Sequence, residues 1–115
     1  MTNNKKIGTA FERDVVRIFK NNGYWVHFIT PDSRGAQPFD IIAVRDDEAI
    51  AVECKTLADS KRYITIDRLE DNQIMAFELW RKCGNTKALV AVKHKGEIIF
   101  IDYEKLKREG KVLCE

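Results

Sequence analysis

Two carboxylates and one amine carry the chemistry that this sequence suggests. In an extended segment over Ala49–Thr56, side chains alternate between two faces, so Glu53 and Lys55 share one face. Asp40 lies upstream at the start of a second apolar run, and it can converge with Glu53 if the two runs pair. Two acidic oxygens bind a hard divalent cation, and a nearby ammonium offsets developing negative charge. The group is therefore suited to metal-assisted hydrolysis of a phosphodiester.

The surrounding segments predict how these residues are positioned. Phe39–Val44 and Ala49–Thr56 are predicted strands, and the polar Asp46-Asp47-Glu48 between them suits a hairpin. Before them, the aromatic and β-branched residues of Tyr24–Thr30 predict another strand. Pro31–Pro38, which contains two prolines and a glycine, must be a loop.

Helices are predicted on both sides of these strands. From Thr9 the apolar residues recur with helical spacing until Asn21-Asn22-Gly23 ends the helix, and these residues are Phe11, Val15, Ile18 and Phe19. After a polar stretch at Ala58–Tyr63, Asp67 and Glu70 resemble a capping box that opens a helix reaching Lys82 or Cys83. The remaining predicted elements are strands at Lys87–His94 and Glu97–Asp102 and a short helix at Tyr103–Glu109.

This order, αβββαββα, favours an α/β fold with a mixed sheet and helices packed against it. With 115 residues, we expect one domain over residues 1–115, with residues 1–6 as a disordered tail. The net charge of +2 is only weakly basic, and the three cysteines are odd in number and lack CxxC spacing. Neither a long apolar span nor a leader pattern is evident. We expect a soluble cytoplasmic protein that does not bind membranes.

Three stretches of the sequence resemble the PD-(D/E)XK nuclease superfamily. They are Gly8–Arg13 opening the first helix, Asp40 at the second strand, and Glu53-Cys54-Lys55 on the third. Within that superfamily the chain is most similar to Holliday junction resolvases of the archaeal Hjc type and the RecU type. The resemblance covers roughly residues 8 to 102, and it implies a restriction-endonuclease-like αβββαβ core with an extra C-terminal strand and short helix.

The resemblance also implies roles for individual residues. Glu12, Asp40, Glu53 and the backbone carbonyl of Cys54 would hold Mg²⁺, for which Mn²⁺ can substitute. Lys55 would be the catalytic lysine, and Gln73 on the second helix would face the site. The implied activity is that of a homodimeric endonuclease that cleaves branched DNA, most specifically a four-way junction.

Each of these residues has an alternative interpretation. Thr9 and Glu12 also fit a capping box, and Glu53 with Lys55 fits an ordinary ion pair on a sheet face. Asp40 could simply end the loop, Gln73 could be a solvated helix residue, and the literal Pro-Asp pair of the superfamily name occurs at Asp32. We favour Asp40 over Asp32 because its strand position and its spacing from Glu53 fit.

Four basic side chains, Arg34, Lys61, Arg62 and Arg68, are predicted to contact DNA phosphates beside the site, although they could equally be a solvated fringe. No recognition-helix motif is apparent, so DNA recognition should depend on shape and backbone. Two other functions remain open. One is another nuclease of the superfamily that acts on flaps, nicks or plain duplex, and the other is a catalytically silent DNA-binding module with the same fold.

Overall fold

The computed structural model describes residues 10–29 and 37–115, and its main element is a five-stranded mixed sheet. The strand order is β1-β2-β3-β5-β6, in which β3 and β5 are parallel and the other neighbours are antiparallel. The elements are α2 (Ala10–Asn21), β1 (Trp25–Phe28), β2 (Ile41–Arg45), β3 (Glu48–Thr56), β4 (Tyr63–Thr65), η1 (Ile66–Arg68), α3 (Asp71–Lys82), β5 (Lys87–His94), β6 (Glu97–Asp102), α4 (Tyr103–Glu109) and β7 (Lys111–Leu113). None of the described helices has the length and apolar character needed to cross a bilayer.

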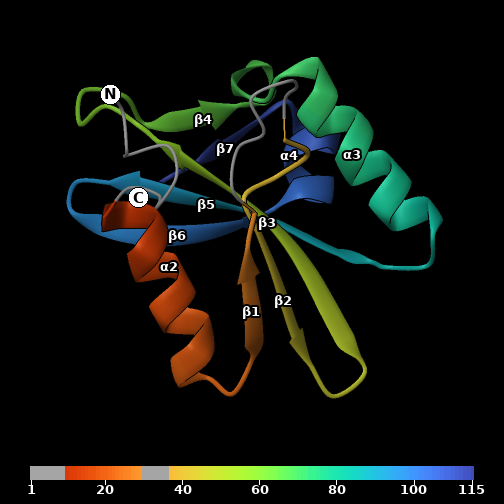
Figure 1. Cartoon of the computed structure of the whole chain (residues 1–115). Helices are drawn as coiled ribbons and strands as arrows, with labels where there is room; N and C mark the ends of the chain where they lie inside the picture. The colour runs from red at the N-terminus through yellow and green to blue at the C-terminus, as the bar shows by residue number, and fades with distance from the viewer. Residues whose placement is uncertain (1–9, 30–36) are drawn as a thin grey trace, which may run out of the picture.

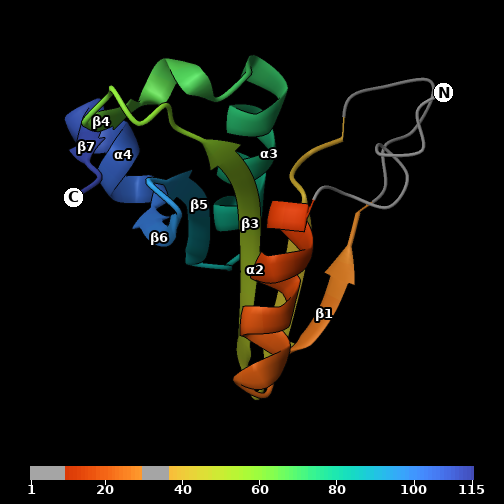
Figure 2. The same ribbon diagram turned by 90° about the vertical axis from the view of Figure 1, so that its left-hand side faces the viewer.

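Helices cover both faces of the sheet, which makes a three-layer arrangement (Figures 1 and 2). Helix α2 packs its apolar stripe, Phe11, Val15 and Phe19, against one face. Helices α3 and α4 pack against the other face. The expected α/β fold, with a mixed sheet flanked by helices in the αβββαβ order, is therefore confirmed.

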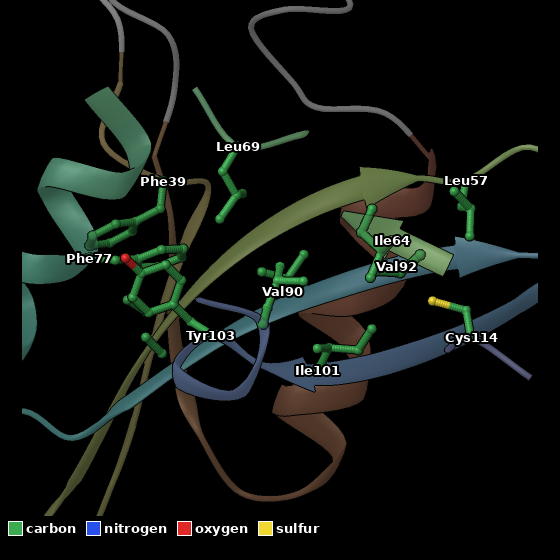
Figure 3. Packing of buried hydrophobic residues seen from close by; sticks show 13 residues of the cluster. Phe39, Leu57, Ile64, Leu69, Phe77, Val90, Val92, Ile101, Tyr103 and Cys114 are labelled. Carbon is green, nitrogen blue, oxygen red and sulfur yellow. The ribbon is translucent and has the colours of Figure 1, made fainter. Parts of the chain in front are cut away.

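The core on the α3 and α4 face is the larger of the two apolar clusters (Figure 3). At one end of it, the ring of Phe77 from α3 stacks on Phe39 with centroids 5.6 Å apart and contacts Tyr103 of α4 at 4.7 Å. Val90 and Val92 of β5 fill the middle. Phe39 directly precedes Asp40, so this packing fixes the backbone next to the predicted metal-binding aspartate.

Strand β3 carries the residues of the candidate site, and its side chains alternate as expected. Ala51 belongs to the cluster under α3, whereas Val52 and Cys54 belong to the cluster under α2. Glu53 and Lys55 therefore stand on the α3 face of the sheet. This places them beneath the N-terminal turn of the helix that follows.

One expected helix boundary was wrong. Asp67 does not open the second long helix but lies in the short 3₁₀ helix Ile66–Arg68, and α3 begins at Asp71 with Glu70 as its N-cap. The physical reason is Leu69, which is buried in the core with extended backbone (φ −89°, ψ 133°) and so interrupts the helical path. The capping residues are consequently Glu70 and Gln73, one turn later than expected.

A second difference is a small sheet that the sequence did not indicate. The polar stretch expected at Ala58–Tyr63 ends in β4, which pairs antiparallel with β7 near the C-terminus. Strands of three residues are too short to show a clear alternation of polar and apolar residues. The first strand is also shorter than the expected Tyr24–Thr30, and the Asp46-Asp47 turn joins β2 to β3 as predicted.

Several expectations lie outside the described residues. These are the disordered tail over residues 1–6, the Thr9 half of the first capping box, and most of the loop expected at Pro31–Pro38, with Asp32 and Arg34 in it.

Candidate active site

The pairing of β2 with β3 brings the two predicted carboxylates together. Ile41 pairs with Val52, so Asp40 and Glu53 occupy the positions just beyond the end of this ladder, and the Asp40 N–H donates to the Val52 carbonyl at 3.0 Å. The two side chains are only 5% and 4% exposed. They share one face of the sheet rather than opening onto opposite sides.

One oxygen of Glu53 is held by two donors, and the other has no donor in the part of the chain that the structure describes. Gln73 Nε2 donates to Glu53 Oε2 at 2.8 Å, and Lys55 Nζ lies 3.6 Å from the same oxygen. Glu53 Oε1 is buried and accepts no hydrogen bond from a donor within residues 10–29 and 37–115. A buried carboxylate oxygen without a partner is costly, so such an atom calls for an explanation.

Asp40 is positioned by the backbone of the neighbouring strand. Its Oδ2 accepts a hydrogen bond from the Cys54 N–H at 2.8 Å. Its Oδ1 accepts from Gln37 Nε2, and Asn72 Nδ2 of α3 donates to the Gln37 carbonyl at 3.0 Å. Because the N–H and C=O of a strand residue point to the same side, the Cys54 carbonyl also faces the Asp40 side of β3.

Gln37 was missed at the sequence level. Its only local signal is its place in the Gln-Pro-Phe-Asp segment, three residues before Asp40. A spacing of three residues in this segment does not belong to any helical or strand periodicity. The contact depends on how α3 docks, because Asn72 of α3 binds the Gln37 carbonyl. The role of Gln37 in holding Asp40 could therefore be recognised only from the structure.

The first turn of α3 fixes the orientation of Gln73. Its Oε1 accepts the Glu70 N–H at 2.9 Å, which leaves its Nε2 to donate to Glu53. Gln73 is buried, so the alternative of a solvated helix residue is excluded for its side chain. One amide thus links the helix N-terminus to the carboxylate on β3.

Burial and proximity raise the pKa values of both carboxyl groups. For Glu53, burial and then the charge of Asp40 raise the pKa from 4.5 to about 8, against the opposing effect of Lys55. For Asp40, burial raises the pKa, the Cys54 N–H lowers it, and the charge of Glu12 raises it. Burial and the nearby carboxylates also raise the pKa of the Cys54 thiol, which therefore stays protonated and is a poor nucleophile.

The donor set fits a hard divalent cation. Carboxylate and carbonyl oxygens are the ligands that Mg²⁺ takes in proteins, and the unpartnered Glu53 Oε1 is an oxygen that such an ion would satisfy. Glu12, in the first turn of α2, is half-buried, and its charge acts on both Asp40 and Cys54. However, no three His, Cys, Asp or Glu side chains converge as a ready metal site within residues 10–29 and 37–115.

The basic residues expected to contact DNA differ in their surroundings. Arg68 Nη2 donates to the Thr56 carbonyl at 2.7 Å, one residue beyond Lys55, and Lys61 is exposed in the connection that follows β3. Arg62 forms an ion pair with Glu115 at 3.0 Å. Arg34 lies outside the described residues.

Comparison with known proteins identifies the family to which the chain belongs. Residues 3–114 match the family described as archaeal Holliday junction resolvase (Hjc). The chain belongs to the Hjc family. The crossover junction endodeoxyribonuclease Hjc of Methanocaldococcus jannaschii is 32% identical over 104 residues, which cover 90% of this chain and 71% of that protein.

The fold of Hjc is also shared. The structure of Archaeoglobus fulgidus Hjc, a Holliday junction resolvase from an archaeal hyperthermophile, matches with a TM-score of 0.68 and 24% identity. The match covers 94% of this chain and 88% of that one. The resemblance to Hjc-type resolvases, the restriction-endonuclease-like fold and the assignment to an endonuclease family are thus confirmed.

Proposed function

We propose that the protein is a Mg²⁺-dependent endodeoxyribonuclease that resolves four-way DNA junctions. The observation that carries this proposal is the buried Asp40–Glu53 pair with Lys55 3.6 Å from Glu53. Membership of the Hjc family supports the junction as the substrate. A mutually repelling carboxylate pair is kept in a protein interior at a cost in stability, which a catalytic role would explain.

The ion would be held by the side chains of Asp40, Glu53 and Glu12 and by the Cys54 carbonyl, with Mn²⁺ able to replace Mg²⁺. When bound, the ion supplies positive charge to the phosphate and lowers the pKa of the attacking water. The carboxyl groups bind the ion in their deprotonated form, and the raised pKa of Glu53 means that metal loading becomes easier as the pH rises.

The other residues hold these groups in place and bind the phosphate. Lys55 directs its ammonium along the same face as Glu53, where it offsets charge that builds on the phosphate oxygens. Gln73 fixes one carboxylate oxygen of Glu53, and the Cys54 N–H fixes one carboxylate oxygen of Asp40. Glu53 Oε1, which no donor among the described residues occupies, is the oxygen left to bind the ion.

Lys61 and Arg68, in the segment that follows β3, would contact DNA phosphates next to the site. Arg34 would be a further contact, and only the sequence supports its role. Arg62 is engaged with Glu115 and receives no DNA role in this proposal. Binding through phosphates is strongly salt-dependent and carries no base specificity. This agrees with a substrate that is defined by its branched shape.

A homodimer would supply the two symmetric nicks that a junction requires. The described part of the chain holds one pair of buried carboxylates, so two chains related by a twofold axis are needed. On the outer face of α3, Met75 (64% exposed) and Leu79 (59% exposed) lie about one turn apart in a hollow of about 530 Å³. Glu78 at this hollow is already paired with Lys107 of α4 at 2.8 Å, so the exposed apolar side chains are what suits contact with the same patch of a second copy.

The protein would act inside the cell, where the DNA is. Its three cysteines, Cys54, Cys83 and Cys114, are all free, which agrees with a reducing compartment.

A cleavage assay tests the proposal. With Mg²⁺ the protein should cut a four-way junction and leave a linear duplex of matched sequence largely intact, and EDTA should stop the reaction. Lys55→Ala should lower the cleavage rate by about 10² to 10³ while junction binding persists. Lys105→Ala, which removes an exposed lysine of α4, is the matched control.

Other outcomes would select the rival functions. Equal cutting of junction and duplex would indicate a nuclease of broader substrate range. Junction binding without any metal-dependent cutting would indicate a silent DNA-binding module, and a fully active Lys55→Ala variant would refute the role of the lysine.

A further inference from the structure

A small hollow lies beside the active site, where the chain leaves β3. Its volume is about 190 Å³, and it is lined by Leu57, Ala58, Lys61, Tyr63, Thr65 and Arg68. Pockets for drug-sized ligands begin at roughly 300 Å³, so this hollow is suited to a smaller group. The connection that forms it runs from the end of β3 through β4 to η1.

Two cations are brought to this hollow by local structure. The Lys61 N–H donates to the Ala58 carbonyl at 3.0 Å, which closes a turn and places Lys61 on the rim. Arg68 Nη2 donates to the Thr56 carbonyl at 2.7 Å, so the guanidinium is tied back to the end of β3. Since a guanidinium carries five N–H donors, this bond leaves others available for a ligand.

The charged side chains that line the hollow are all positive. Its described lining contains two cations and two hydroxyl-bearing residues, Tyr63 and Thr65, and no carboxylate. Asp67 lies nearby, where its Oδ1 accepts a hydrogen bond from the Thr65 hydroxyl. Asp59 lies in the turn between Ala58 and Lys61, where its Oδ1 accepts the Lys95 N–H at 3.2 Å. The lining itself therefore carries two cations and no carboxylate, which suits a small anion, and Arg with Lys is a common pair for phosphate.

The position of the hollow relates it to the carboxylate pair. Leu57 is the first residue after β3 and lies four residues beyond Glu53, which at the usual rise of a strand is about 13 Å. Phosphates of one DNA strand are spaced by about 3.4 Å of helix axis. An occupied hollow would therefore contact the same DNA arm, a few nucleotides away from the phosphate at the metal ligands.

We propose, resting on the function proposed above, that this hollow binds one backbone phosphate of the DNA arm that is cut, through Lys61 and Arg68. A second fixed phosphate would set the direction in which the arm crosses the active site. The site is distinct from Arg62, although that residue is adjacent in sequence, because Arg62 is paired with Glu115.

Junction binding without cleavage provides the test. We would measure the affinity of the full chain for a four-way junction in EDTA from about 50 to 200 mM salt. Lys61→Ala combined with Arg68→Gln should lower the salt slope by about 0.9, the value for one phosphate, and weaken binding roughly tenfold. Arg108→Gln is the matched control, because Arg108 is an exposed arginine of α4 beside Glu109.

Neutral methylphosphonate links placed one at a time in each arm would locate the contact. The wild type should lose affinity when one link within a few nucleotides of the cut is neutral, and the double variant should be indifferent to that same link. An unchanged salt slope, or identical link profiles for both proteins, would overturn the proposal.

Loss of stability in a variant and failure of the proposed function each give a result that differs from failure of the phosphate contact. If Arg68→Gln lowers the unfolding temperature, Lys61→Ala alone carries the test, since the exposed Lys61 side chain forms no hydrogen bond or ion pair with the described residues. Failure of the proposed function would appear as a wild type that does not cut junctions with Mg²⁺, whereas the link profile is obtained without cleavage.

Discussion

Replacing Glu53 by Gln should stabilise the metal-free protein, and the effect should grow with pH. Glu53 is 4% exposed, and burial with the charge of Asp40 raises its pKa from 4.5 to about 8. A raised pKa means that the folded state binds the proton more tightly than the unfolded state does. The stability due to that proton is present below pH 4.5 and is lost as the pH rises toward 8.

The magnitude follows from the size of the shift. Each pH unit between the two pKa values removes about 1.4 kcal/mol from the free energy of unfolding. At pH 7 the loss comes to about 3 kcal/mol, a large part of the stability of a small domain. Glutamine keeps the shape of the side chain and an oxygen for Gln73 Nε2 but has no proton to lose.

Urea unfolding in EDTA would measure this difference at several pH values between about 5 and 8. The wild type should lose stability relative to Glu53→Gln as the pH rises, and Mg²⁺ should restore the wild type but not the variant. Glu97→Gln, at an exposed position of β6, is the control. A difference between wild type and variant that does not change with pH, or that changes in the opposite direction, would refute the reasoning.

Three further substitutions test other parts of the site and its assembly. Asp40→Asn should abolish Mg²⁺-dependent junction cleavage while Asp32→Asn leaves it intact; the reverse result would reassign the metal-site aspartate. Gln73→Ala frees Glu53 Oε2, so calorimetric titration should show Mg²⁺ affinity reduced by about 10 to 100-fold, and unchanged affinity would count against the amide. Leu79→Glu should convert a dimer to monomers in sedimentation, whereas Leu113→Glu on β7 should not; a dimeric Leu79→Glu protein would exclude this face of α3.

The first residue of the second long helix could not be predicted from the sequence. Asp67 with Glu70 and Glu70 with Gln73 have the same spacing, and both resemble a capping pair. The choice depends on Leu69, whose burial in the core forces extended backbone between the two candidates. Burial of one residue is a tertiary property, so the local pattern could not select the start of α3.

The sequence by itself predicted the residues that we propose to carry the chemistry, and it determined which of them share a face. Glu53 and Lys55 lie side by side because alternation along a strand is a local property of the backbone. Only the tertiary structure decided that Asp40 meets Glu53 through the strand register, and that Gln73 and Gln37 each hold one of these carboxylates. These contacts depend on strand register and on where α3 docks, which residue spacing alone does not encode.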